Sequence, residues 1–110
     1  MIQRYLTCSV DTAAHEVYET IVEGSLSGEC VENYTLPSGN GKCVVMVSEK
    51  HFMRNSSRAS LTVTVDNLSG RTRISSVGSG GGNGMLFGFD WGAADDLENS
   101  AIEAVDEYLA

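Results

Sequence analysis

The stretch that decides the fold is residues 59–66, which read Ala-Ser-Leu-Thr-Val-Thr-Val-Asp. Apolar and polar side chains alternate there with a period of two, and four of the eight are β-branched, which predicts a β-strand. Because successive side chains of a strand point to opposite faces, this strand has one face on a core and the other in water. Such one-sided strands are typical of antiparallel sheets.

The segments on either side of 59–66 predict further strands joined by turns. Residues 67–70 (Asn-Leu-Ser-Gly) close a hairpin onto a shorter strand at 71–77. In the other direction, a polar connection leads back to a strand at 42–52 with apolar residues on both faces, which indicates a central position or cover on each face. The turn residues at 37–41 separate it from a weaker strand at 30–36. We therefore expect an antiparallel meander.

The amino-terminal part of the chain predicts one more strand and a helix. Residues 2–10 alternate with a period of two, and Asp11 or Thr12 then offers a side-chain oxygen that can cap a helix. Apolar residues recur at helical spacing from Ala14 to Val22, and Gly24 or Gly28 can end this helix.

The carboxy-terminal part predicts a second, acidic amphipathic helix. Asp90 can cap it from about Gly92, and its apolar stripe continues to Leu109. The order β-α-β-β-β-β-α then predicts a two-layer α+β domain, with an antiparallel sheet of about five strands and both helices on one face.

Length and composition favour one soluble domain. The 110 residues suffice for a single core, so we treat 1–110 as one domain, and the apolar fraction of 42% is ordinary for globular proteins. The sequence contains no run of the ~20 apolar residues that a membrane helix needs. The first residues lack the pattern of a secretory signal, and we expect a cytoplasmic protein.

Charge is unevenly distributed along the chain. The net charge is −8, yet residues 42–73 carry six basic side chains against two acidic ones, and residues 90–110 carry seven acidic and no basic ones. The acidic total argues against nucleic acid as a partner, because phosphates require a basic surface. The segregation suits self-association, or a match within the chain between a basic sheet and an acidic helix.

A glycine-rich run at 78–84 leads into the apolar cluster Met-Leu-Phe-Gly-Phe-Asp-Trp at 85–91. Glycine loops before helices can hold anions, but neither GxGxxG nor the P-loop spacing is present here. We therefore expect the run to be a flexible connection or backbone that passes close to another element, and an anion site is the weaker alternative. The apolar cluster either completes the core or lines a pocket between the last helix and the sheet. The candidate pocket residues are Phe87, Phe89, Trp91, Leu97, Ala101 and Val105.

The basic middle of the chain offers a second candidate surface. Its four arginines could gather on the outer side of the hairpin and dock an acidic partner, such as the acidic tail of a second copy. The simpler alternative is a set of surface ion pairs. These arginines are Arg54, Arg58, Arg71 and Arg73.

No catalytic or metal-binding residues can be named from the sequence. His15 and Glu19 share a helix face, but a second histidine and a third ligand are lacking, so we expect no metal site and no cofactor. The three cysteines have no CxxC or zinc spacing, and we interpret them as free thiols. No general acid–base pair can be assigned either, so an enzyme is the least favoured class.

Two motif regions resemble a family of small uncharacterised bacterial proteins, a domain of unknown function. They are Phe52-Met53-Arg54-Asn55-Ser56-Ser57-Arg58-Ala59-Ser60 and the region from Gly80-Gly81-Gly82-Asn83-Gly84 to Phe89-Asp90-Trp91-Gly92-Ala93. The resemblance covers most of the chain and implies a bacterial cytoplasmic origin. It implies no activity, and no functional residue is carried over from it.

We expect a non-enzymatic binding or self-assembly domain that forms a homo-oligomer, because exposed strand edges and segregated charges favour association. The alternative is a binder of a small apolar ligand, of helix-grip type, held between the carboxy-terminal helix and the sheet.

Overall fold

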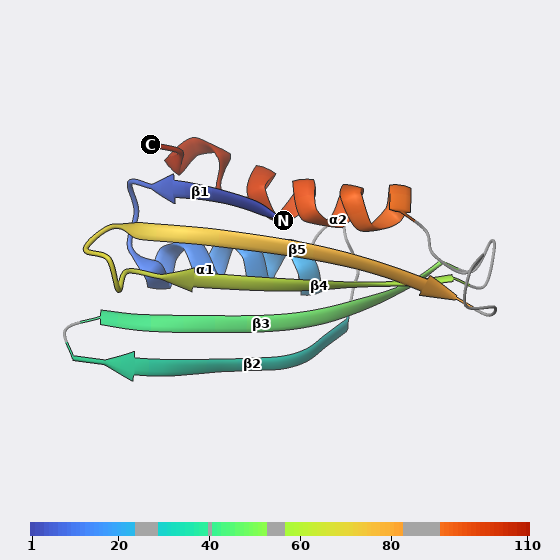
Figure 1. Ribbon diagram of the computed structural model, residues 1–110, viewed down its shortest axis with the longest axis horizontal. Coiled ribbons are helices and arrows are strands. Elements are labelled where there is room, and N and C mark those ends of the chain that lie inside the picture. Colours follow the sequence, from blue (N-terminus) through green and yellow to red (C-terminus); the bar gives the residue numbers. More distant parts are fainter. Residues whose placement is uncertain (24–28, 40, 53–56, 83–90) are drawn as a thin grey trace.

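The computed structural model describes residues 1–23, 29–39, 41–52, 57–82 and 91–110, and confirms a two-layer α+β fold (Figure 1). Five antiparallel strands lie in the order β1-β5-β4-β3-β2. The elements are β1 (Ile2–Leu6), α1 (Val10–Tyr18), the π-helical turn η1 (Glu19–Glu23), β2 (Glu29–Ser38), β3 (Gly41–Phe52), β4 (Ser57–Asp66), β5 (Thr72–Gly82), α2 (Trp91–Glu103) and the 3₁₀ turn η2 (Asp106–Tyr108).

The core lies between one face of the sheet and the two helices. β4 is the middle strand, and its apolar residues Ala59, Leu61, Val63 and Val65 are all at most 1% exposed, as their alternation predicts. α1 packs over β3, β4 and β5, whereas α2 packs over β1, β4 and β5. Each helix contributes a buried stripe, and these stripes consist of Val10, Ala13 and Val17 from α1 and Leu97, Ala101 and Val105 from α2.

The first helix begins earlier than the sequence pattern predicts. The alternation at 2–10 predicts a strand as far as Val10, with a cap at Asp11 or Thr12, but β1 ends at Leu6 and α1 starts at Val10. Ser9 is the N-cap, and its Oγ accepts a hydrogen bond from the Thr12 amide at 3.2 Å. The Thr12 amide has no backbone partner within the helix, so this hydrogen bond stabilises a helix here over a continued strand. The glycines expected to end this helix lie outside the described residues.

Most of the glycine run is a strand and not a flexible connection, and its backbone lies beside β4, as the other form of the prediction allows. Gly78 to Gly82 continue β5 and pair with β4, from Gly78 opposite Leu61 to Gly82 opposite Ser57. Glycine has a low intrinsic preference for strands. Pairing with β4 therefore determines the structure of this segment. Asn83 and Gly84 lie outside the described residues.

The last helix is shorter than its apolar stripe. α2 ends at Glu103, and the chain continues through η2 to an isolated bridge between Leu6 and Leu109. The Thr7 amide donates to the Tyr108 carbonyl at 2.7 Å, and the Ala110 amide donates to the Tyr5 carbonyl at 3.0 Å. The carboxy-terminal residues therefore cover the outer edge of β1.

Polar contacts fix α2 against the sheet. The fully buried Ser76 donates from Oγ to the Glu98 carbonyl at 3.1 Å. The Glu98 carboxylate lies 3.1 Å from the α-amino group of Met1, so the start of β1 and the middle of α2 are tied together. Among the described residues, no helix is long and apolar enough to cross a membrane.

The capping role of Ser9 can be tested by substitution. Ser9→Ala should lower the free energy of unfolding by about 1 kcal/mol, because the Thr12 amide loses its acceptor. Urea denaturation followed by circular dichroism measures this loss. Ser9→Asp is the matched control and should retain nearly all of the stability, since aspartate also caps helices. Equal stability of Ser9→Ala and the wild type would contradict the assignment.

Candidate functional site

The sheet face opposite the helices carries exposed apolar side chains. Tyr5 (41% exposed), Tyr34 (43%), Leu36 (52%) and Val77 (41%) come from β1, β2 and β5. The strand register places Tyr34 beside Val45 and Leu36 beside Cys43 on the same face. Both described helices pack on the other side of the sheet. We call this surface the open face.

The two edges of the sheet differ in how they end. The edge at β1 is covered by the carboxy-terminal residues, whereas β2, at the opposite edge, pairs with β3 and with no other described strand (Figure 1). A register shift between Cys30 and Glu32 and the presence of Pro37 interrupt this second edge at both ends. Bulges and prolines are devices that limit edge pairing. The regular part that remains is the segment from Glu32 to Leu36.

Two of the four predicted arginines are engaged within the chain. Arg73 Nη2 lies 3.3 Å from Oδ2 of Asp66, whose side chain is only 4% exposed. The Arg71 guanidinium lies 4.0 Å from the centroid of the Tyr5 ring, which is a cation–π contact. Asp66 therefore has a cationic partner, and the amide of Leu68 also donates to its Oδ1 at 3.3 Å.

The other two arginines do not join this group in the described structure. Arg58 pairs with Gly81, and Asp66, next to Arg73, lies at the other end of β4. Because a strand rises about 3.3 Å per residue, Arg58 and Asp66 are roughly 26 Å apart along β4. Arg54 lies outside the described residues. The structure thus brings Arg71 and Arg73 together near one end of the sheet, whereas the backbone of Arg58 lies at the other end of β4.

The residues of the predicted pocket at the last helix either belong to the hydrophobic core or lie outside the described residues. Leu97 is 5% exposed, and Ala101 and Val105 are fully buried in the main hydrophobic cluster. Trp91 is the first residue of α2, but its side chain is outside the described parts. Phe87 and Phe89 lie wholly outside them. The described part of this region therefore shows packed side chains.

A hollow lies instead beside the first helix. It has a volume of about 290 Å³ and lies between α1 and the helix-side face of β2 and β3. Its floor includes Val44 and Met46, and its walls include Tyr18, Asn33 and Thr35. We call this hollow the α1 groove. This hollow is not predicted from the sequence, although Asp11, Ala14, His15 and Tyr18 recur at the spacing of one helical stripe.

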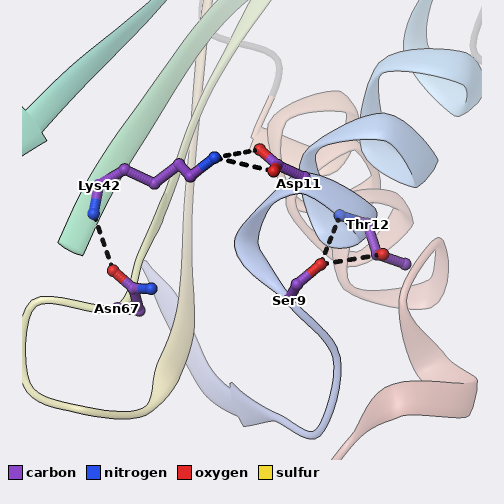
Figure 2. Close-up of polar contacts among 5 residues, drawn as sticks. All are labelled: Ser9, Asp11, Thr12, Lys42 and Asn67. Atoms are coloured by element: carbon purple, nitrogen blue, oxygen red, sulfur yellow. Dashed lines mark hydrogen bonds and ion pairs between the residues drawn. The ribbon is translucent and has the colours of Figure 1, made fainter. Parts of the chain in front are cut away.

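An ion pair holds one end of the α1 groove (Figure 2). Lys42 Nζ lies 2.7 Å from Oδ1 and 2.8 Å from Oδ2 of Asp11. The Lys42 amide donates to Oδ1 of Asn67 at 2.8 Å, and the Asn67 amide donates back to the Lys42 carbonyl at 3.3 Å. Asn67 therefore fixes the start of β3, from which the lysine side chain reaches α1. Because both charged groups are exposed, the pair contributes at most about 1 kcal/mol.

The raised pKa values of the Cys8 and Cys43 thiols keep these two groups protonated near neutral pH. Burial raises the pKa of the Cys8 thiol, and the nearby Glu16 carboxylate raises it further. Burial likewise raises the pKa of the Cys43 thiol, with Asp66 adding to the effect and Arg73 opposing it. Both cysteines are free. Since the thiolate is the nucleophile, neither position has the low pKa of a reactive cysteine.

The fold defines a class: a two-layer α+β domain with one sheet face covered by two helices. Within that class, the chain belongs to a family of unknown function, DUF6054, whose model matches residues 1–109. This agrees with the resemblance to a domain of unknown function. Comparisons with curated proteins and with solved structures gave no significant match.

The protonated state of the thiols predicts a pH dependence of alkylation. Near neutral pH, iodoacetamide should modify Cys8 and Cys43 more slowly in the folded protein than in urea, because raised pKa values reduce the thiolate fraction. The folded rates should rise with pH and should continue to rise beyond the pH at which the unfolded rates level off. Peptide mass spectrometry assigns each site, and Cys30 is quantified separately. Faster alkylation of either residue in the folded state would contradict the assignment.

Proposed function

We propose that this protein is a non-enzymatic binding and self-assembly domain that forms a homodimer through the free edge of β2. The observation that carries the proposal is the difference between the two sheet edges. The chain's own carboxy-terminal residues pair with β1, whereas the described chain provides no strand for β2. A second copy can supply that strand.

The backbone of β2 is suited to such pairing. Hydrogen bonding in an antiparallel ladder alternates, so every second residue of β2 directs its N–H and C=O away from β3. Two copies that pair antiparallel satisfy these groups and generate an isologous two-fold contact, the commonest symmetry of soluble oligomers. The paired sheets then form one continuous sheet of ten strands.

Side chains on the open face add apolar contacts to this edge. A two-fold axis at Thr35 places Tyr34 of one copy opposite Leu36 of the other. Both side chains are strongly exposed in the single chain. Cross-strand pairs of an aromatic and an aliphatic side chain each contribute roughly 0.2–1 kcal/mol. The contact therefore joins backbone pairing with the burial of exposed apolar surface.

Charge gives this mode of association a recognisable salt dependence. Each chain has a net charge of −8, so two copies repel each other. Added salt screens this repulsion and should strengthen dimerisation through β2. Docking of an acidic tail on an arginine surface should instead weaken with salt. The contacts of Arg71 with Tyr5 and of Arg73 with Asp66 make that second route the less favoured one.

Bacterial origin and a cytoplasmic location belong to the same proposal; the origin rests on the family resemblance, and the location rests on that resemblance and on the sequence pattern. The alternative of an apolar ligand held at α2 gains no support from Leu97, Ala101 and Val105, which fill the described core.

The edge can be tested with charged substitutions and native mass spectrometry. The double variant Tyr34→Lys, Leu36→Lys should shift the dimer to monomer, because four like-charged ammonium groups would face each other across the axis. Val77→Lys is the matched control, since Val77 is similarly exposed on the open face but lies on β5. It should remain dimeric.

Other outcomes would overturn this proposal. A wild-type protein that stays monomeric across a concentration and salt series would exclude a homodimer. Dissociation by Val77→Lys as well would show that the contact is formed by the open face and not by the β2 edge. Circular dichroism of each variant separates loss of association from loss of folding.

A further inference from the structure

The free side of β1 is covered by a short segment of the same chain (Figure 1). We call residues 106–110, which contain η2 and pair with β1, the strap. The amide and the hydroxyl of Thr7 both donate to the Tyr108 carbonyl, at 2.7 and 3.1 Å. The Ala110 amide donates to the Tyr5 carbonyl at 3.0 Å. Because the backbone groups of an edge strand alternate in direction, these contacts occupy groups that would otherwise face a further strand.

The strap is held by these contacts more than by burial. Val105, the residue before it, is fully buried, but four of the five strap residues are exposed, and Tyr108 is partly buried against the core. Segments with little buried apolar surface open at a lower free-energy cost than the whole molecule. Opening of the strap leaves Val105 and the buried stripe of α2 in place.

The strap also places negative charge beside β1. It carries Asp106 and Glu107, whereas residues 1–7 contain no carboxylate side chain. Each chain has a net charge of −8, so these two carboxylates oppose the approach of a second copy to this edge. Opening the strap therefore removes an electrostatic barrier as well as the backbone partner of β1.

Once uncovered, β1 presents an edge that matches the same edge of a second copy. Unpaired strand edges are templates for pairing with another chain. A two-fold axis at Tyr5 places Gln3 of one copy opposite Thr7 of the other, so the outward backbone groups of all three residues find partners. The Gln3 carbonyl accepts from Arg4 Nη1 at 2.7 Å in the single chain, and this exposed contact can exchange for the Thr7 amide of the second copy.

We propose that the strap is a releasable guard that limits self-assembly. While it is closed, copies associate through β2 alone and stop at the dimer; when it opens, β1 pairs with β1 of a second copy. The limit on size rests on the proposed function, because only a chain with two pairing edges can extend further. Alternating β2–β2 and β1–β1 contacts then join the dimers into an open-ended sheet.

Hydrogen exchange of the wild-type protein tests whether the strap opens by itself. The Thr7 amide, bonded to the Tyr108 carbonyl, should exchange more than about tenfold faster than the Val63 amide in the middle of β4. Low concentrations of urea should change the Thr7 rate little, since opening of the strap exposes little surface. Equal protection of the two amides would show that the strap opens only when the whole protein unfolds, and would overturn the proposal.

A full-length variant tests what the opening does. Leu109→Pro, Ala110→Pro removes the amide that donates to Tyr5 and disfavours the 3₁₀ turn at Tyr108. Native mass spectrometry should show species larger than the dimer, in amounts that rise with protein concentration. Leu109→Val, Ala110→Ser is the matched control, because both amides remain, and it should match the wild type. A size distribution unchanged by the two prolines would contradict the role of the strap.

Combination with the edge variant Tyr34→Lys, Leu36→Lys separates this proposal from the proposed dimer. With β2 blocked, the closed chain should be monomeric, and the chain with the proline strap should stop at a dimer formed through β1. If β2 pairing fails and the strap proposal holds, the wild type is a monomer and the proline variant alone is a dimer. If the strap proposal fails, the prolines change neither background.

One further substitution assigns the new contact to β1. Tyr5→Lys places two ammonium groups at the β1 axis and should return the combined variant to monomer. Val77→Lys is the control on the open face and should leave its dimer intact. Aggregates of mixed size in place of a discrete dimer would count against β1 pairing. Circular dichroism shows whether each variant is folded, and the exchange experiment on the wild type decides the matter if the proline variant is not.

Discussion

The structure depends on one requirement: the apolar face of β4, at the centre of the sheet, must be removed from water. Leu61, Val63 and Val65 are completely buried, and burial of such side chains provides about 1.5–3 kcal/mol each. A chain of this length supplies two helices for the task, and both must lie on the same side of the sheet. The opposite face remains uncovered by them, and β2 remains at the margin of the covered face. The free β2 edge and the α1 groove beside it are therefore consequences of covering β4.

Most of the architecture follows from local patterns in the sequence. The period-two alternation at 59–66 and the helical spacing of apolar residues near each end correctly predict the strands, the helices and the two layers. The errors occur where a sequence pattern competes with a hydrogen bond that the pattern does not take into account. The alternation of residues 8–10 suggests a continued strand, but the hydrogen bond from Thr12 to Ser9 begins a helix there. Gly78–Gly82 suggest a flexible connection or backbone that passes close to another element, and pairing with β4 makes them a strand.

The candidate surfaces were harder to predict, because they depend on strand order and not on spacing along the chain. Arg58 and Arg73 follow each other closely in a basic segment, yet β4 and β5 run in opposite directions and place them at opposite ends of the sheet. The sequence also does not indicate which edge strand stays unpaired. The β1 edge is covered through contacts such as that between Tyr5 and Ala110, which are far apart in the chain. Likewise, the α1 groove joins a helical stripe to two strands that follow it in the chain, and only their packing shows that a space remains.

The covering of β1 by the carboxy-terminal residues also has a consequence for the order of folding. β2, β3, β4 and β5 are joined by successive connections, so their pairing closes short loops and can occur early. β1 instead pairs with β5, which closes the long loop between Leu6 and Thr72. The other side of β1 is covered only when residues 108–110 are present. During synthesis, the strand made first is thus among the last to be secured. Until then the nascent meander has two unprotected edges, and the interval before residues 108–110 emerge is the period of greatest exposure to aggregation.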